Sequence, residues 1–149
     1  MEEAVRVGFE KCEKAFLDQS YMGKVDKSGS CGIIAFFYGK DCYVSNVGDS
    51  RAVMSSRRGK VIRELSIDHK ASDDYEQKRI IEAGGRIYQT KIRNANPNLK
   101  IFYEGEEHQY ILGPHRAFPG RLSVTRTFGD IEAKLAEFGG NSRAIVCTP

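Results

Sequence analysis

Four short β-rich segments in the first half of the chain restrict the fold more than any other feature of the sequence. They cover residues 31–38, 42–47, 51–56 and 61–66, and turn-forming residues separate them at intervals of eight to ten residues. Strands joined by such short turns pair with their neighbours, so the pattern predicts an antiparallel meander, as in one half of a β-sandwich. The first segment is apolar throughout, which is typical of a strand covered on both faces.

Amphipathic spacing predicts three helices around these strands. Apolar residues recur at steps of four, three and four within residues 3–18, which places one apolar stripe on a first helix. Ser72-Asp73, followed by Glu76, indicates a helix cap with an acidic first turn, and Gly84-Gly85 ends the second helix. A short third helix is expected over 131–138.

The rest of the chain is predicted to hold short strands and one long irregular stretch. Strands are expected at 86–89, 121–127 and 144–147. Residues 90–120 contain three of the four prolines and show no clean period. A loop of this length inside a domain is usually functional or mobile.

Composition excludes several classes of protein. The 149 residues are 40% apolar and 29% charged, with a net charge of +3. The charges are interspersed and the longest basic cluster is Arg57-Arg58-Gly59-Lys60, which argues against a nucleic-acid partner. The longest apolar run is eight residues, whereas a membrane helix needs about 20. The chain starts with an acidic segment unlike a secretory signal. We therefore expect an intracellular protein, cytoplasmic or nuclear, with neither nucleic acid nor membrane as a partner.

The four cysteines, at positions 12, 31, 42 and 147, form no metal-binding spacing. A turn at 39–41 would place Phe37 opposite Cys42 and leave Cys31 far along the strand, so a disulfide between these two cysteines is not expected. The interpretation is four buried or half-buried reduced thiols in an intracellular protein.

Two aspartates and one histidine are candidates for chemistry. Asp49 lies in a tight turn, where its carboxylate could bind Mg or Mn, close the turn, or pair with Arg51. Asp130 is ambiguous in the same way and is also placed to cap the helix over 131–138. His69 follows a strand, where a turn histidine bonded to the backbone is commoner than a catalytic group. The sequence contains no nucleophile motif, so no catalytic residue is assigned.

Five motifs in order resemble the protein phosphatase 2C family, and the resemblance covers nearly the whole chain. They are Ser28-Gly29-Ser30, the segment 43–53 around Gly48-Asp49-Ser50-Arg51, the segment 65–70 with Asp68-His69-Lys70, the segment 79–85 ending in Gly84-Gly85, and the segment 120–130 ending in Phe128-Gly129-Asp130.

The resemblance implies an α+β fold, an α-β-β-α sandwich of antiparallel sheets flanked by helices. It also implies a Mg- or Mn-dependent protein serine/threonine phosphatase, in which two metal ions activate a water that attacks the phosphorus of phosphoserine or phosphothreonine. Phosphorylated proteins are then the expected partners. Asp49 matches a family aspartate that contacts an additional, weaker metal, and residues 86–120 match a variable flap near the active site.

The chain departs from the family pattern in its metal ligands. It contains no Asp-Gly dipeptide, and so lacks the family's Asp-Gly-His-Gly, Ser-Asp-Gly and other metal-binding segments. We expect residues 1–149 to be a single partial domain that binds Mg or Mn weakly and is inactive alone. The alternative is a catalytically dead, phosphatase-like scaffold that binds a protein partner. Sheet edges left open in a partial domain predict self-association.

Overall fold

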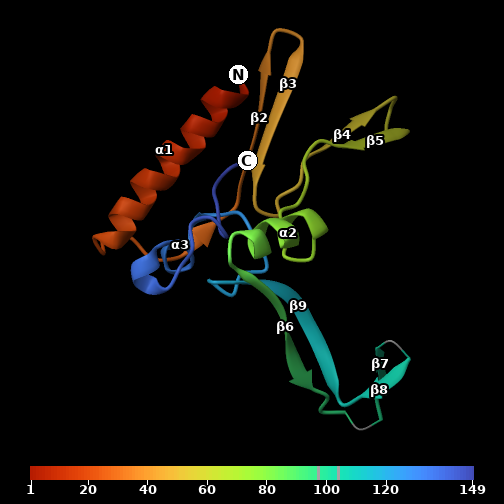
Figure 1. Cartoon of the computed structure of the whole chain (residues 1–149). Coiled ribbons are helices and arrows are strands. Elements are labelled where there is room, and N and C mark those ends of the chain that lie inside the picture. Colours follow the sequence, from red (N-terminus) through yellow and green to blue (C-terminus); the bar gives the residue numbers. More distant parts are fainter. Residues whose placement is uncertain (97, 104) are drawn as a thin grey trace.

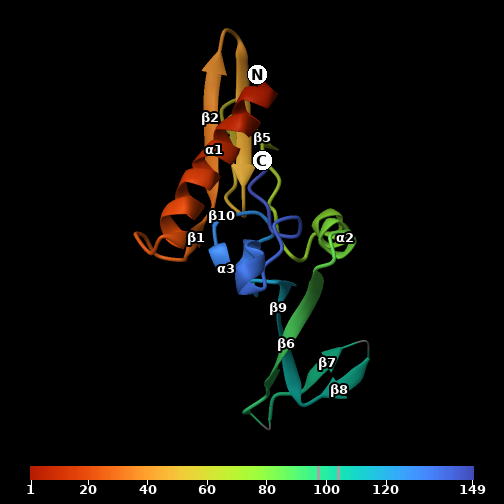
Figure 2. The same ribbon diagram turned by 60° about the vertical axis from the view of Figure 1, so that its left-hand side comes forward.

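Two hairpins extend toward one side of a small helical centre, and a long arm extends toward the opposite side (Figures 1 and 2). The structure, a computed structural model, describes residues 1–96, 98–103 and 105–149. The helical elements are α1 (Glu2–Tyr21), α2 (Asp74–Glu82), α3 (Ile131–Lys134) and the 3-10 helix η1 (Ala136–Phe138). The strands are β1 (Gly29–Ser30), β2 (Gly32–Tyr38), β3 (Asp41–Val47), β4 (Val53–Ser56), β5 (Val61–Glu64), β6 (Arg86–Arg93), β7 (Ile101–Tyr103), β8 (Glu106–His108), β9 (Tyr110–Phe118) and β10 (Phe128–Gly129).

The predicted strands of the first half form two hairpins. β2 pairs with β3 in the expected register, with Phe37 opposite Cys42, and β4 pairs with β5. Cys31 and Cys42 are both free thiols, as predicted, but Cys12 and Cys42 are exposed, so the prediction of buried or half-buried thiols is wrong for these two. The continuous meander is wrong, because β3 does not pair with β4: the described strands form five separate two-stranded sheets. The α+β class with antiparallel strands is confirmed.

The prediction that the apolar segment 31–38 is covered on both faces is also wrong for this chain. Phe37 is 79% exposed and Tyr38 is 68% exposed. The first helix, α1, packs on β10 and α3 rather than along β2. The outer half of the β2–β3 hairpin therefore stands clear of the helical centre (Figure 1).

The second helix begins and ends where the sequence predicted. The Asp73 side chain accepts a hydrogen bond from the Glu76 backbone N–H at 3.1 Å, which satisfies one of the free donors at the start of α2. The chain leaves the helix at Gly84, whose φ of +85° is a left-handed conformation that glycine adopts without strain. Ile80, fully buried, anchors α2 to the core.

The buried core is small and lies where α2, the base of the arm and the C-terminal segment meet. Its fully or almost fully buried apolar members are Ala71, Ile80, Ala117, Ala133, Ala144 and Ile145. None of the helices in the described residues is long and apolar enough to cross a membrane.

The expected long loop is largely regular structure. β6 and β9 form an antiparallel hairpin, with an irregularity between Gln89 and Lys91, and β7 and β8 form a second hairpin at its tip. We call β6–β9 the stem of the arm and β7–β8 its tip. The prediction of a strand at 86–89 is confirmed and extended, since β6 continues to Arg93.

Three other predictions for the second half need correction. Residues 121–127 and 144–147 form isolated β-bridges in place of strands, such as the one between Arg126 and Val146. The predicted helix over 131–138 is divided at Leu135, whose extended backbone separates α3 from η1.

Candidate functional site

Asp49 lies in the turn that follows β3 and is exposed. The Cys31 thiol donates a hydrogen bond to Asp49 Oδ1 at 3.5 Å. Burial raises the pKa of the Cys31 thiol, and the nearby charges of Asp49 and Asp130 contribute to the rise. The thiol therefore stays protonated at neutral pH, as its role of donor requires. The alternative of an Asp49–Arg51 ion pair is not observed, because Arg51 binds Asp68 instead.

His69 secures the turn that carries Asp49. The Gly48 backbone N–H donates to His69 Nδ1 at 3.3 Å, and the His69 backbone N–H donates to the Gly48 carbonyl at 2.9 Å. Gly48 has a φ of +100° and lies tightly against Cys31. Burial lowers the pKa of His69, with the charge of Arg126 adding to the effect. The prediction of a turn histidine bonded to backbone is confirmed.

Asp68 joins the same region to the β4–β5 hairpin. Both of its carboxylate oxygens accept hydrogen bonds from Arg51 at 2.9 Å, and Lys70 donates a third at 2.8 Å. The hydrogen bonds from Arg51 and Lys70 lower the pKa of Asp68 to about 2. This carboxylate is therefore ionised and fully engaged with cations of its own chain.

Asp130 does not cap the third helix with its side chain, so that alternative is wrong. The residue occupies the N-cap position, but its backbone is left-handed, with a φ of 52°, and no side-chain cap hydrogen bond forms. Burial raises the pKa of Asp130. The carboxylate instead lies against Gly29, where any added Cβ would clash with it. Asp130 and Asp49 thus both lie near Cys31.

The described residues offer no complete metal site. Among them, no group of three or more His, Cys, Asp or Glu side chains is arranged to hold a metal ion. Mg and Mn require several oxygen ligands, and Asp49 supplies one exposed carboxylate. The two-metal centre that the resemblance implies therefore does not fit the side chains of this part of the chain.

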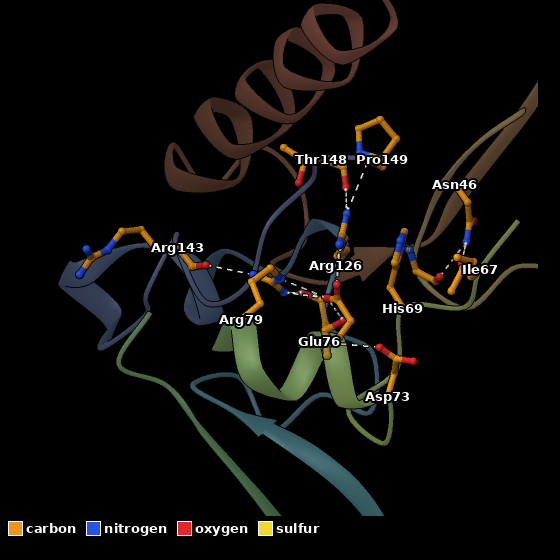
Figure 3. A network of polar contacts seen from close by, with 12 residues as sticks. Asn46, Ile67, His69, Asp73, Glu76, Arg79, Arg126, Arg143, Thr148 and Pro149 are labelled. Atoms are coloured by element: carbon orange, nitrogen blue, oxygen red, sulfur yellow. Dashed lines mark hydrogen bonds and ion pairs between the residues drawn. The ribbon is translucent and has the colours of Figure 1, made fainter. Parts of the chain in front are cut away.

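A buried carboxylate, Glu76, is the centre of the polar network in Figure 3. Its side chain is 2% exposed and accepts hydrogen bonds from Arg79, Arg126 and Thr125. Burial alone would raise its pKa, but the hydrogen bonds from Arg126, Arg79 and Thr125 outweigh this cost and hold the pKa at about 2. Glu76 therefore acts as a fixed anion and not as a proton donor.

The two arginines bound to Glu76 extend the network to the end of the chain. Arg126 donates to the carbonyl of Thr148 at 3.1 Å, and Arg79 donates to the carbonyls of Thr125 and Arg143 (Figure 3). Sequence reasoning assigned Glu76 only to the helix cap. Its partners at 125 and 126 are about fifty residues away in sequence, and no local spacing reveals them.

A second buried ion pair fixes α1. Lys134 donates to Glu13, the Gly129 N–H donates to the same carboxylate at 2.8 Å, and Lys134 also donates to the Thr127 carbonyl at 2.6 Å. These contacts join α1 to β10 and α3 across more than one hundred residues of sequence. The pair positions the segment that ends in Asp130.

An open hollow of about 990 Å³ lies between the start of α1 and the hairpins, and Asn46 and His69 line it. Asn46 is 5% exposed and donates to the carbonyls of Gly48 and Ile67, both at 2.9 Å. Its Oδ1 has no hydrogen-bond partner within the described part of the chain. The amide therefore joins the Gly48 turn to the segment at Ile67.

Comparison with known proteins gives the class. The family model described as protein phosphatase 2C matches residues 1–149, and the turn around Asp49, the end of α2 and the segment 120–130 are among the parts that carried the resemblance. The chain belongs to the protein phosphatase 2C family.

Curated relatives agree with this assignment. A probable protein phosphatase CG10417 of Drosophila melanogaster is 53% identical over 83 residues, which is 56% of this chain and 12% of the fly protein. Probable protein phosphatase 2C 16 of Oryza sativa is 30% identical over 93% of this chain and 25% of the rice protein. The chain thus spans a quarter or less of the length of these relatives.

Solved structures support the fold. A phosphatase from Toxoplasma gondii has a TM-score of 0.55 and 16% identity, with all of this chain and 48% of that protein covered. A Caenorhabditis elegans sex-determining protein has a TM-score of 0.57 and 22% identity, with 90% of this chain and 27% of that protein covered.

Proposed function

We propose that the protein is a Mg- or Mn-dependent protein serine/threonine phosphatase, whose substrates are phosphoserine and phosphothreonine in other proteins. The observation that carries the proposal is the family match over all 149 residues. Relatives named as probable protein phosphatases 2C, in rice and in Arabidopsis thaliana, support it.

The part of the site that this chain supplies is a framework. His69, Asn46 and Cys31 hold the Gly48–Asp49 turn in one conformation, and the Glu76 network ties the segment before Asp130 to α2. Two hard cations cannot be held by one exposed aspartate. We therefore propose that residues 1–149 alone bind Mg or Mn weakly, with Asp49 as an accessory contact, and do not turn over substrate.

The experiment is a phosphatase assay on the purified 149-residue chain. With Mn present, hydrolysis of p-nitrophenyl phosphate and of a phosphothreonine peptide should not exceed the rate of a matched Asp49→Asn variant. Asp41→Asn, which removes another exposed aspartate of the same hairpin, serves as a control for surface charge. Mn-dependent turnover that a chelator abolishes would contradict the proposed inactivity.

A scaffold without catalytic activity is the second candidate. It is favoured by the lack of a metal-ligand cluster among the described residues. The reading frame on either side of the chain distinguishes the two candidates. If it encodes further segments, an extended protein with Mn-dependent phosphothreonine hydrolysis is an enzyme, and an extended protein that binds no Mn is a scaffold.

A further inference from the structure

The charge of this protein is concentrated in the arm. Residues 86–118, which form the arm, contain five Lys and Arg and three Asp and Glu, so they carry +2 of the net charge of +3. Two of the three acidic residues, Glu106 and Glu107, belong to β8 at the tip. The stem itself has four cations, Arg86, Lys91, Arg93 and Arg116, and no acidic residue.

The cations of the stem lack carboxylate partners within the part of the chain that the structure describes. Among the described residues, none of the four forms an ion pair with a carboxylate. By contrast, Lys100 at the tip pairs with Glu107 at 3.5 Å. Arg86 lies over the Phe118 ring at 4.7 Å, and Lys91 lies over the Tyr110 ring at 4.5 Å. A cation held over an aromatic face keeps its outer side available to an anion.

The two faces of the stem both carry positive charge. Arg86 pairs with Phe118 and Tyr88 pairs with Arg116, so the two arginines are diagonal neighbours on one face. Lys91 and Arg93 alternate onto the other face, nearer the tip, where the last four residues of β6 are all exposed. A ligand that follows β6 along its length would meet three of the four cations in turn.

The edge of β6 is open to a further strand. The stem is two-stranded among the described residues, so each strand has one edge without a partner strand. On β9 that edge is partly taken, because the Leu112 N–H donates to the Tyr103 hydroxyl at 2.8 Å. An extended peptide can add to an exposed edge through backbone hydrogen bonds, and side-chain charge then decides which sequence binds.

We propose that the stem of the arm is a docking surface for an acidic, extended segment of a partner protein, which adds along β6. Charge complementarity selects the acidic peptide, and the open edge selects an extended polypeptide over nucleic acid, which cannot form a β-ladder. The proposal goes beyond the phosphatase assignment and does not depend on catalytic activity in this chain.

The test is fluorescence anisotropy with the 149-residue chain and a labelled peptide in which Glu alternates with Val and Thr. A peptide with Lys in place of Glu and a single-stranded oligouridine are the comparison probes. We expect the acidic peptide to bind, with an affinity that falls as salt rises. Lys91→Glu with Arg93→Glu should weaken binding about tenfold, since two attractions become repulsions.

The matched control changes two exposed cations elsewhere, Arg57→Glu with Arg58→Glu in the β4–β5 turn, and should leave binding within about twofold. Lys91→Gln with Arg93→Gln serves if the double Glu variant fails to fold, and should weaken binding by a smaller factor. Hydrogen exchange should show protection of β6 amides by the peptide. Equal binding of the Lys peptide, stronger binding of the RNA, equal effects of both charge reversals, or unprotected β6 amides would overturn the proposal.

Discussion

At the residue scale, Glu76 is the side chain on which most of the centre depends. Two arginines and a threonine converge on one carboxylate that is almost fully buried. Glu76→Gln leaves Arg79 and Arg126 without their anion, and we expect a loss of about 3 kcal/mol in the free energy of unfolding at neutral pH. Urea unfolding followed by circular dichroism measures it.

The stabilisation by Glu76 should depend on pH in a defined direction. The pKa of Glu76 falls from 4.5 to about 2 on folding, so its contribution is complete above pH 4.5 and is lost as the pH falls toward 2. The difference in stability between wild type and Glu76→Gln should shrink over that window. Glu82→Gln, an exposed glutamate on the same helix, should change stability by less than about 0.5 kcal/mol. A Glu76→Gln variant as stable as wild type at pH 7 would show that the network is not stabilising.

At the element scale, α2 depends on its cap. Asp73→Ala removes the acceptor for the Glu76 N–H and should lower the free energy of unfolding by about 1 kcal/mol, whereas Asp73→Ser should retain most of it. Asp74→Ala removes the neighbouring exposed carboxylate, which does not cap, and is the matched control. Equal losses for Asp73→Ala and Asp74→Ala in thermal unfolding would argue that the helix dipole, and not the cap, accounts for the effect.

Some elements were predictable from local sequence patterns and others were not. Turn residues and caps are local signals, so the β2–β3 register and the ends of α2 were predictable from a few neighbouring residues. Apolar Leu122 and Val124 alternate with polar neighbours in 121–127 and predicted a half-buried strand, but Leu122 and Val124 are only half-buried, whereas Thr125 and Thr127 are buried. In the structure, the Ser123 carbonyl bonds to Ala71, whereas the Thr125 and Thr127 N–H groups bond to His69 and Val146. Residues 121–127 therefore make single backbone contacts with several parts of the chain and form no continuous strand pairing. Hydrophobic periodicity does not distinguish such a segment from a strand.

Most of the arm was predicted as a loop and not as strands, for a different physical reason. The irregularity in the stem places the two residues 113 and 114 of β9 opposite the single residue Thr90 of β6, so the two-residue period is broken in β9. At the site, the position of Asp49 in a turn and the backbone role of His69 could be predicted from spacing. The Glu76 and Glu13 ion pairs could not, because their partners are brought together only by the tertiary fold.

At the scale of the whole molecule, apolar surface on the β2–β3 hairpin predicts self-association. Phe37 and Tyr38 are mostly exposed near the hairpin turn, and exposed apolar surface beside an open sheet edge favours pairing with another copy. Light scattering should show the average mass rising with concentration, and Phe37→Ser should reduce the rise. Tyr75→Ser, which removes a similarly exposed aromatic ring from α2, should not. A constant monomer mass at high concentration would contradict this prediction.

At this scale, we propose that these 149 residues form the framework of a phosphatase 2C site and lack its two-metal centre. Manganese binding tests it most directly, because the EPR signal of free Mn decreases as the ion is bound. We predict a titration of the purified chain with at most one weak site per chain, weakened further by Asp49→Asn and unchanged by Asp41→Asn. Two tightly bound manganese ions per chain would contradict the proposal that these residues lack the two-metal centre.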